Sequence, residues 1–343
     1  MEKLPELNYR SFLADAMRDY LDYLDHLGFS IVGPAYDLRH VDRFLVENRI
    51  GCLQQCDSRF WLGLLAQYQG RVKANTLRMW RQTFHGFCRY LVRQGCMPEN
   101  PATAFPVPKP PHYRPYVFST EELRRCFDFL QQKAIHSANP VTSYRFRSRY
   151  TFYHLLYACG LRVSEAIRLS TADYSAEQST LFIRPSKFRK DRLIPIGQKV
   201  ASNLHRLLDL RRQLFGIAPE GLFFLILPQR RPYHRDWASG CFRAVLQHLG
   251  IYRPESYYHG CYHGTPHLHE LRRAFAVHRL LRWCHEGANV DAKLPLLATY
   301  MGHSYFGHTK TYLTLTQQLL SEAANRFARG FDRLDWLNRD SEL

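Results

Sequence analysis

Six residues in the C-terminal half of this 343-residue chain carry side chains suited to reaction at a phosphodiester. Two arginines, a lysine and two histidines supply positive charge and hydrogen-bonding groups, and a tyrosine supplies a hydroxyl nucleophile. Phosphoryl transfer depends mainly on positioning and on stabilising the charge that grows in the transition state, so this set favours attack on phosphorus. The candidates are Arg162, Lys187, His269, Arg272, His303 and Tyr312.

Two of the arginines lie in sequences that predict helices. Gly160 predicts the end of one helix, and the next helix then carries Arg162 in its first turn, with Glu165 beside it. His269 and Arg272 are three residues apart, so a helix places them on one face. Taken alone, an arginine at a helix start is usually a surface residue, and a His-Arg pair at this spacing is common.

The tyrosine is identified by its context only. Tyr312 follows the Gly-His turn at His303 by nine residues, and the chain holds 21 tyrosines. Most tyrosines in globular proteins are partly buried core residues, and this remains the ordinary explanation for Tyr312 by itself. The residue types therefore need support from the surrounding sequences.

A histidine-rich stretch over residues 259–269 raises the alternative of a zinc site. Its spacings fit no closed four-ligand site well, and none of the nine cysteines forms a CxxC pair. We therefore predict no metal site and mostly reduced thiols. The residues that would compete for zinc are His259, Cys261, His263, His267 and His269.

The charge of the chain favours a polyanionic partner. Lysine and arginine number 47 against 30 aspartates and glutamates, which gives +17 at pH 7 and a pI near 9.6. Nucleic acid is the first candidate and a membrane surface is the rival. No apolar run of about 18 residues and no signal peptide is present, so we expect a cytoplasmic protein that does not enter membranes.

Residues 8–97 predict helices with short breaks, because apolar residues recur at helical spacing. The last of these helices interleaves basic with aromatic side chains. The basic residues form either a solvated face or a surface that contacts DNA phosphates, and the two alternatives are compatible. The candidate DNA-binding residues on this segment are Lys73, Arg78, Arg81 and Arg89.

Six prolines in residues 101–115 cannot continue a helix and predict an extended connector. We expect a helical domain over residues 1–105, a linker over 106–118 and a second domain over 119–343. Ser119 and Glu122 have the spacing of a capping box at a helix start. Two short apolar strands, 181–183 and 193–196, flank a basic segment and predict a β-hairpin with a basic tip.

Four of these local sequences together resemble the tyrosine recombinase (phage integrase) family. They are GLRVSEAIRL from Gly160, KDRLIPIG from Lys190, HELRRAFA from His269, and MGHS from Met301 with a tyrosine nine residues after its histidine. The resemblance covers roughly residues 115–330. It implies a mainly α fold with a small β-hairpin or sheet: an N-terminal, all-helical, SAM-like core-binding domain, followed by an α/β catalytic domain.

The resemblance also implies a role for each candidate. Tyr312 attacks the scissile phosphate and forms a 3′-phosphotyrosine bond, while Arg162 and Arg272 clamp the non-bridging oxygens with their planar guanidinium groups. The phosphodiester energy is stored in the protein–DNA bond and returned when a 5′-hydroxyl attacks, so no cofactor is expected. The enzyme class is a site-specific recombinase.

The remaining roles concern protons and orientation. Lys187 at the hairpin tip donates a proton to the leaving 5′ oxygen, and Lys190 is its rival for that role. His269 assists proton transfer from Tyr312, and His303 hydrogen-bonds the phosphate. The resemblance further implies that Glu165 orients a neighbouring active-site residue. Lys190 and Arg192 in the hairpin are also expected to contact DNA.

The expected partners are double-stranded DNA with a specific recombination site and further copies of the chain, assembled as a tetrameric synapse on DNA. A predicted amphipathic helix over residues 316–329 packs either on its own domain or on a neighbouring copy. The segment between Arg272 and His303 is longer than in compact family members and indicates a mobile-element subgroup, active in integration or transposition. Two alternatives are a DNA-binding protein of this fold that needs partner recombinases, and strand relaxation of the type IB topoisomerase kind.

Overall fold

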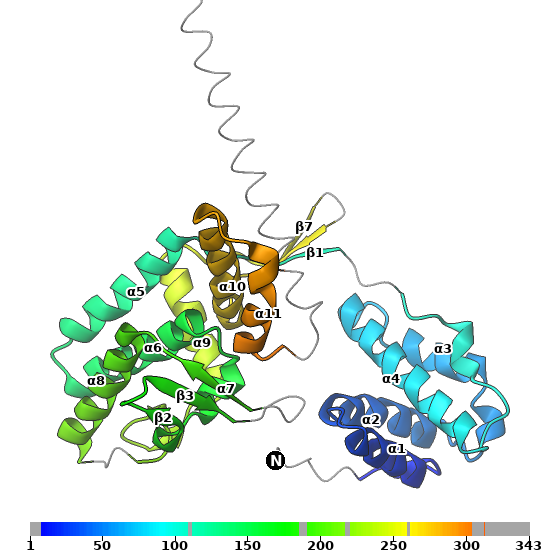
Figure 1. Cartoon of the computed structure of the whole chain (residues 1–343). Helices are drawn as coiled ribbons and strands as arrows, with labels where there is room; N and C mark the ends of the chain where they lie inside the picture. Colours follow the sequence, from blue (N-terminus) through cyan, green and yellow to red (C-terminus); the bar gives the residue numbers. More distant parts are fainter. Residues whose placement is uncertain are drawn as a thin grey trace, which may run out of the picture. The chain divides into compact units, whose positions relative to one another are not determined.

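A computed structural model describes residues 8–108, 112–184, 191–216, 220–258 and 261–303, together with Tyr312 (Figure 1). The chain divides into two compact units, Met1–His112 and Tyr113–Leu343. The division falls inside the proline-rich stretch in which the sequence predicts a linker. Lys187, Lys190 and the predicted tail helix over residues 316–329 lie outside the described residues.

The described part of the N-terminal unit is helical. Helix α4 buries Trp80, Phe84, Phe87 and Leu91 along one face, in keeping with the helical spacing of apolar residues in the sequence. These side chains pack against apolar residues of the three preceding helices to form one core. The elements are α1 (Ala14–His26), α2 (Val32–Glu47), η1 (Leu53–Gln55), α3 (Ser58–Ala66), α4 (Ala74–Arg93) and η2 (Pro101–Ala104).

The second unit combines helices with short strands. Its core is formed mainly by α5, α6, α8, α9 and α10, and a smaller apolar cluster lies between α10 and α11. The elements are β1 (Tyr113–Arg114), α5 (Thr120–Ile135), α6 (Pro140–Ala158), α7 (Val163–Arg168), η3 (Thr171–Asp173), β2 (Tyr174–Ser175), β3 (Thr180–Ile183), β4 (Arg192–Pro195), α8 (Gln198–Phe215), β5 (Leu225–Ile226), β6 (Arg231–Pro232), α9 (Arg235–His248), β7 (Ser256–Tyr258), β8 (Cys261–His263), α10 (Leu268–His285) and α11 (Val290–Met301).

Several local predictions are confirmed in this unit. Ser119 caps α5, with its hydroxyl accepting from the Glu122 backbone while the Glu122 carboxylate accepts from the Ser119 N–H. Strands β3 and β4 form the predicted antiparallel hairpin, with Ile183 opposite Arg192, and β2 extends it to a three-stranded sheet. The fold is mainly helical with small sheets, as predicted.

Two features of the fold differ from what the sequence predicts. The end of the predicted linker is not simply an extended connector, because β1 pairs in parallel with β8. That strand belongs to a β7–β8 hairpin within a region for which the sequence predicts no strands. Strands of two or three residues carry too little periodicity to be recognised from sequence, and β1 is defined by its pairing with distant residues. Within the described part of the chain, no helix is both long and apolar enough to cross a membrane.

Candidate active site

The turn between α6 and α7 supplies the first wall of the site. Helix α6 ends at Ala158 and Gly160 adopts a left-handed φ of +58°, where a Cβ would lie 2.5 Å from the Phe275 ring. Glycine is therefore required both by the backbone and by the close packing of α10. The turn places Arg162 at the N-cap of α7, one residue before the helix rather than within its first turn.

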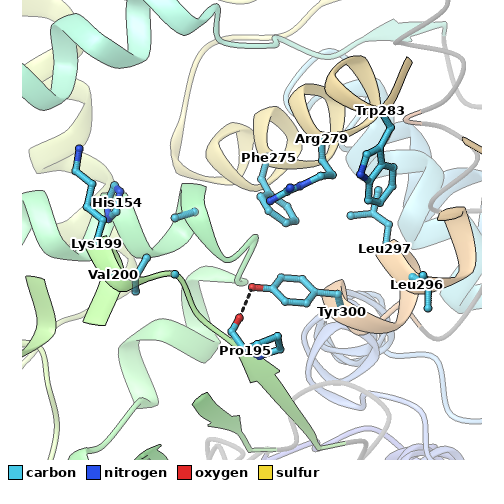
Figure 2. A pocket seen from close by; sticks show the side chains of 12 residues that line it. His154, Pro195, Lys199, Val200, Phe275, Arg279, Trp283, Leu296, Leu297 and Tyr300 are labelled. Atoms are coloured by element: carbon cyan, nitrogen blue, oxygen red, sulfur yellow. Dashed lines mark hydrogen bonds between the residues drawn. The ribbon is translucent and has the colours of Figure 1, made fainter. Parts of the chain in front are cut away.

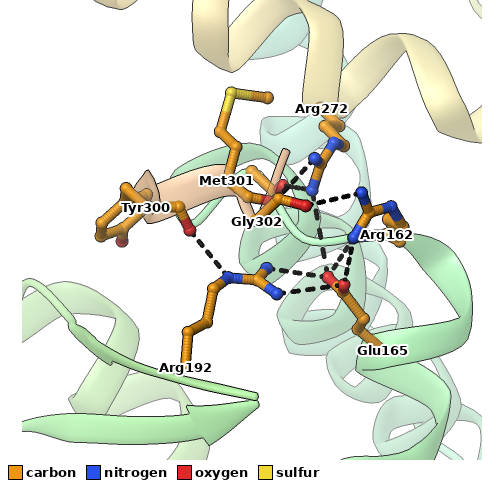
Figure 3. Close-up of polar contacts among 8 residues, drawn as sticks. Arg162, Glu165, Arg192, Arg272, Tyr300, Met301 and Gly302 are labelled. Atoms are coloured by element: carbon orange, nitrogen blue, oxygen red, sulfur yellow. Dashed lines mark hydrogen bonds and ion pairs between the residues drawn. The ribbon is translucent and has the colours of Figure 1, made fainter. Parts of the chain in front are cut away.

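Glu165 lies at the centre of an arginine cluster (Figure 3). Its side chain is fully buried and accepts from the Arg162 backbone N–H at 2.9 Å and from Arg162 Nη1 at 2.7 Å. Arg192 adds a bidentate pair, with Nη1 and Nη2 at 3.1 and 3.0 Å, and Arg272 Nη1 lies 3.9 Å away. Three guanidinium groups, from the N-cap of α7, from β4 and from α10, thus converge on one carboxylate.

This environment keeps Glu165 ionised. Burial alone would raise the pKa of the carboxyl group, but hydrogen bonding and charge from Arg192, the Arg162 backbone N–H and the charge of Arg272 outweigh it. Together they lower the pKa of Glu165 to about 2. One buried negative charge therefore compensates part of a strongly positive site at neutral pH.

The same three arginines bind the C-terminal end of α11, each through one backbone carbonyl. Arg192 Nε donates to the Tyr300 carbonyl at 2.8 Å, Arg272 Nη2 to the Met301 carbonyl at 2.7 Å, and Arg162 Nη2 to the Gly302 carbonyl at 2.8 Å. A helix C-terminus leaves carbonyl groups unpaired and carries partial negative charge, so cations are stabilising there. Figure 3 shows the three side chains approaching these carbonyls.

Gly302 ends α11 in a left-handed conformation, with φ of +68°. A Cβ at this position would lie 2.7 Å from Arg192 Nη1 and 2.9 Å from its Cζ. The absence of a side chain therefore lets the Arg192 guanidinium lie against the backbone. This contact joins the β3–β4 sheet to the segment that bears His303.

Arg272 is the most enclosed of the three arginines, at 2% exposed, and its Nη1 also donates to the Gly160 carbonyl at 2.6 Å. Burial lowers the pKa of Arg272 to about 10, and Arg162 adds to this effect while Glu165 and Tyr312 oppose it. The group remains charged at neutral pH. Arg162, whose side chain is 26% exposed, is the arginine of the pair with an open face.

His303 and Tyr312 lie next to one another beside this cluster. Their ring centroids are 5.8 Å apart and the rings are inclined by 27°. Tyr312 is 7% exposed and packs with Phe275 and Met301 in the apolar cluster between α10 and α11. The structure therefore brings Tyr312, His303 and Arg272 into one region, although they belong to two separate sequence motifs.

His269 lies in the first turn of α10, one helical turn before Arg272. Desolvation by the surrounding protein and the positive charges of Arg273 and Arg272 lower the pKa of His269, although the ring keeps an exposed face. A neutral imidazole is thus available at neutral pH, and it can accept a proton.

Comparison with known proteins identifies the family. The model of the phage integrase family matches residues 119–318, which is more than half of the chain. This chain belongs to the phage integrase family of tyrosine recombinases.

Two relatives from Sinorhizobium fredii illustrate the similarity. The putative integrase/recombinase y4rB is 31% identical over 72% of this chain and 76% of its own length. The putative integrase/recombinase y4rE is 29% identical over 93% of this chain and 96% of its own length. Among solved structures, the Tn1549 transposon integrase in complex with a circular intermediate DNA matches with a TM-score of 0.62 at 16% identity, over 87% of this chain and 94% of that one. At that identity the match shows a common fold.

The arginine cluster of this tyrosine recombinase also gives Arg192 a place in the site. Its side chain is 10% exposed, and Nε, Nη1 and Nη2 bind Glu165 or the Tyr300 carbonyl. Sequence reasoning missed this positioning role. The sequence signal for this role was that Arg192 stands at the start of a strand, directly after the basic tip of the hairpin. Contact of Arg192 with DNA remains a prediction.

The basic residues of the N-terminal unit lie where the sequence places them, on or next to α4. Lys73 is the N-cap and is exposed, as is Arg89, while Arg78 and Arg81 are partly buried. Arg78 Nε donates to Asn75 Oδ1 at 3.0 Å. Their contact with DNA remains a prediction.

The histidine-rich segment is used in other ways where it is described. His263 stacks on Tyr258 and shares a hydrogen bond with its hydroxyl, and His267 lies 3.3 Å from Glu270. Among the described residues, no group of three histidine, cysteine or acidic side chains is placed to hold a metal. His259 lies outside the described residues.

Proposed function

We propose that this chain is a site-specific DNA recombinase that cuts and rejoins DNA through a 3′-phosphotyrosine bond to Tyr312. The observation that carries the proposal is the convergence of Arg162 and Arg272 on the helix end that leads to His303, with Tyr312 beside it. Positively charged side chains lie beside a nucleophile, and this is the arrangement that a phosphoryl transfer site requires.

In the proposed reaction, the Tyr312 hydroxyl oxygen forms a bond to phosphorus and the bond to the 5′ oxygen breaks. His269 accepts the tyrosine proton, and Lys187 gives a proton to the departing 5′ oxygen. Arg162 and Arg272 stabilise the negative charge on the non-bridging oxygens, with His303 as a further hydrogen-bond donor. The reverse step, with a 5′-hydroxyl from a partner strand, restores Tyr312 and completes strand exchange.

Glu165 and Arg192 act in this scheme as positioning residues. Glu165 fixes the orientation of the Arg162 fork, and Arg192 connects the same carboxylate to the Tyr300 carbonyl. A charged group that is held before the reaction costs little reorganisation in the transition state. The cluster therefore supplies a preorganised cationic surface for phosphate.

The proposed partners are duplex DNA carrying a specific site and further copies of the chain. Solved structures of related fold include a lambda integrase tetramer bound to a Holliday junction and XerH bound to its substrate, with TM-scores of 0.58 and 0.60. The net charge of +17 suits binding to DNA phosphates. Integration or transposition of a mobile element is the proposed biological setting.

An apolar groove on the second unit suits assembly (Figure 2). It has a volume of about 470 Å³ and includes Phe275 and Trp283 of α10 and Leu296 and Leu297 of α11. Leu296 is 67% exposed, so the groove presents an uncovered apolar surface. We propose that it receives the amphipathic segment 316–329 of a neighbouring copy, whose predicted apolar face consists of Leu320, Ala323, Ala324 and Phe327.

Covalent trapping tests the proposed chemistry. The wild-type protein, a Tyr312→Phe variant and a control Tyr257→Phe variant, which changes a residue that is 62% exposed, are incubated with nicked DNA from the chain's own genetic neighbourhood. We expect a protease-sensitive, denaturant-resistant adduct with the wild type and the control, and none with Tyr312→Phe. Tight DNA binding without an adduct would instead favour a binding protein that depends on partner recombinases.

The same proteins and DNA distinguish recombination from strand relaxation. A recombinase forms adducts at defined positions and assembles into tetramers on DNA that contains two sites. Relaxation of any supercoiled plasmid by the monomer, with adducts spread over the sequence, would favour the type IB topoisomerase alternative.

A further inference from the structure

A second concentration of positive charge lies in the same unit, away from the arginine cluster. A pocket of about 420 Å³ is lined by residues of α5, α6 and α8, and three of them are basic: Arg147, Lys199 and Arg206. No acidic residue is among the described residues that line it. None of Arg162, Arg192 and Arg272 contributes to this pocket, so the two sites are distinct.

The positive charges of this pocket are not compensated within the described part of the chain. Neither Arg147 nor Arg206 forms an ion pair there, and burial and then the charge of Arg206 lower the pKa of Arg147. The adjacent His154 adds neither a positive nor a negative charge at neutral pH, since burial and the charge of Lys199 lower its pKa to about 4. Like charges held together favour the binding of an anion between them.

The N-terminus of helix α8 adds backbone donors to the pocket. This 18-residue helix begins at Gln198, and its N-cap residue is Gly197, which has no side chain to accept from the first turn. Gln198, Lys199 and Ser202 all line the pocket. The N–H groups of the first turn and the positive end of the helix dipole both favour a negatively charged ligand.

Tyr150 adds a hydroxyl group to the lining of the pocket. Tyr150 is 4% exposed and lines the pocket, with its ring packed against Phe127 and His154. Its hydroxyl has no hydrogen-bond partner among the described residues. The hydroxyl oxygen is not among the fully buried atoms that lack a partner, so it is open to solvent and available to donate to a ligand oxygen in the pocket.

We propose that this pocket is an anion site that binds a phosphate group between Arg147 and Arg206, with the Tyr150 hydroxyl and the first turn of α8 as further donors. Two guanidinium groups match the oxygens of phosphate better than one lysine does. The phosphate belongs either to a small free anion or to the backbone of bound DNA. The site does not depend on the chemistry at Tyr312, so adduct formation and phosphate binding are separate measurements.

Titration calorimetry with inorganic phosphate and with pyrophosphate, at constant ionic strength, tests the site on the full chain. The variants are Arg147→Gln and Arg206→Gln. The matched control is Arg212→Gln, which removes the same charge from an exposed residue of α8 outside the pocket. We expect each pocket variant to bind at least roughly tenfold more weakly than the wild type and the control to be unchanged, because charge-assisted hydrogen bonds are lost.

A second arm identifies the source of the phosphate. If the DNA backbone occupies the pocket, bound DNA blocks inorganic phosphate, and Arg206→Gln lowers the slope of log binding constant against log salt by about one. If a small anion is the ligand, phosphate binds equally well to the DNA complex and the slope is unchanged. Equal losses in Arg206→Gln and Arg212→Gln, or no phosphate binding together with an unchanged DNA salt slope, would overturn the proposal.

Discussion

Replacing Glu165 by glutamine tests whether one buried carboxylate organises the arginine cluster. The pKa of Glu165 is lowered from 4.5 to about 2, and each pKa unit corresponds to about 1.4 kcal/mol. Ionised Glu165 therefore stabilises the folded state by about 3 kcal/mol at neutral pH. The variant also leaves three guanidinium groups facing one another, and breaking a buried ion pair costs about 3–5 kcal/mol.

The pH dependence of the free energy of unfolding provides a second, independent test. Because the folded-state pKa is depressed, the contribution is complete above pH 4.5 and is lost as the pH falls toward 2. Glutamine does not titrate, so the stability difference between wild type and Glu165→Gln is expected to shrink over this window. Other carboxylates titrate in both proteins and cancel in the difference.

The free energy of unfolding is measured in urea, with hydrogen exchange of peptides from α10 as the probe, so that the result reports on the second unit specifically. The control is Glu286→Gln, which removes an exposed carboxylate paired with Arg282 at the end of the same helix and is expected to behave as wild type. A loss of less than about 1 kcal/mol at pH 7, or a difference that stays constant down to low pH, would refute the reasoning.

The same variant separates positioning from charge. Removing a negative charge does not weaken attraction to DNA, so the affinity of Glu165→Gln for its site is expected to be unchanged or higher. The rate of covalent adduct formation is expected to fall by roughly tenfold or more, because Arg162 loses its anchor. A parallel loss of affinity and rate would instead indicate general unfolding.

Three further predictions concern neighbouring residues. Arg192→Lys keeps the charge but loses the bidentate pair, so adduct formation slows at least about tenfold in trapping assays while the salt slope of DNA binding stays constant. Gly302→Ala forces Arg192 to move, so it is expected to lower the free energy of unfolding by more than Gly287→Ala does. Gly287 has a similar φ of +66°, but no atom lies within 4 Å of a Cβ placed there. Equal losses in urea unfolding would show that Arg192 moves aside at no cost. In the free protein, burial and the charges of Arg273 and Arg272 are expected to hold the pKa of His269 below its ordinary value of 6.5. NMR titration of its ring tests this, and a pKa at or above 6.5 would contradict that environment.

The sequence predicted those features that depend on interactions between residues close together in the chain. The turn at Gly160, the capping box at Ser119 and the buried stripe on α4 each depend on residues within a few positions of one another. The family resemblance also followed from short sequences in a fixed order, and the match over residues 119–318 confirms it. Strands β1, β7 and β8 were not predicted, because each has only two or three residues and β1 pairs with residues that are distant in the chain.

The sequence by itself determined which groups are available: the arginines, histidines and tyrosine, their charge, and the turns and helices that carry them. Only the tertiary structure decided how they meet. Arg162 and the Gly302 carbonyl are 140 residues apart, and Arg192 and the Tyr300 carbonyl are 108 apart. No local periodicity encodes such contacts. They form because packing of α10 and α11 against α6 and the β3–β4 sheet buries Glu165, and a buried carboxylate and an open helix end both require donors.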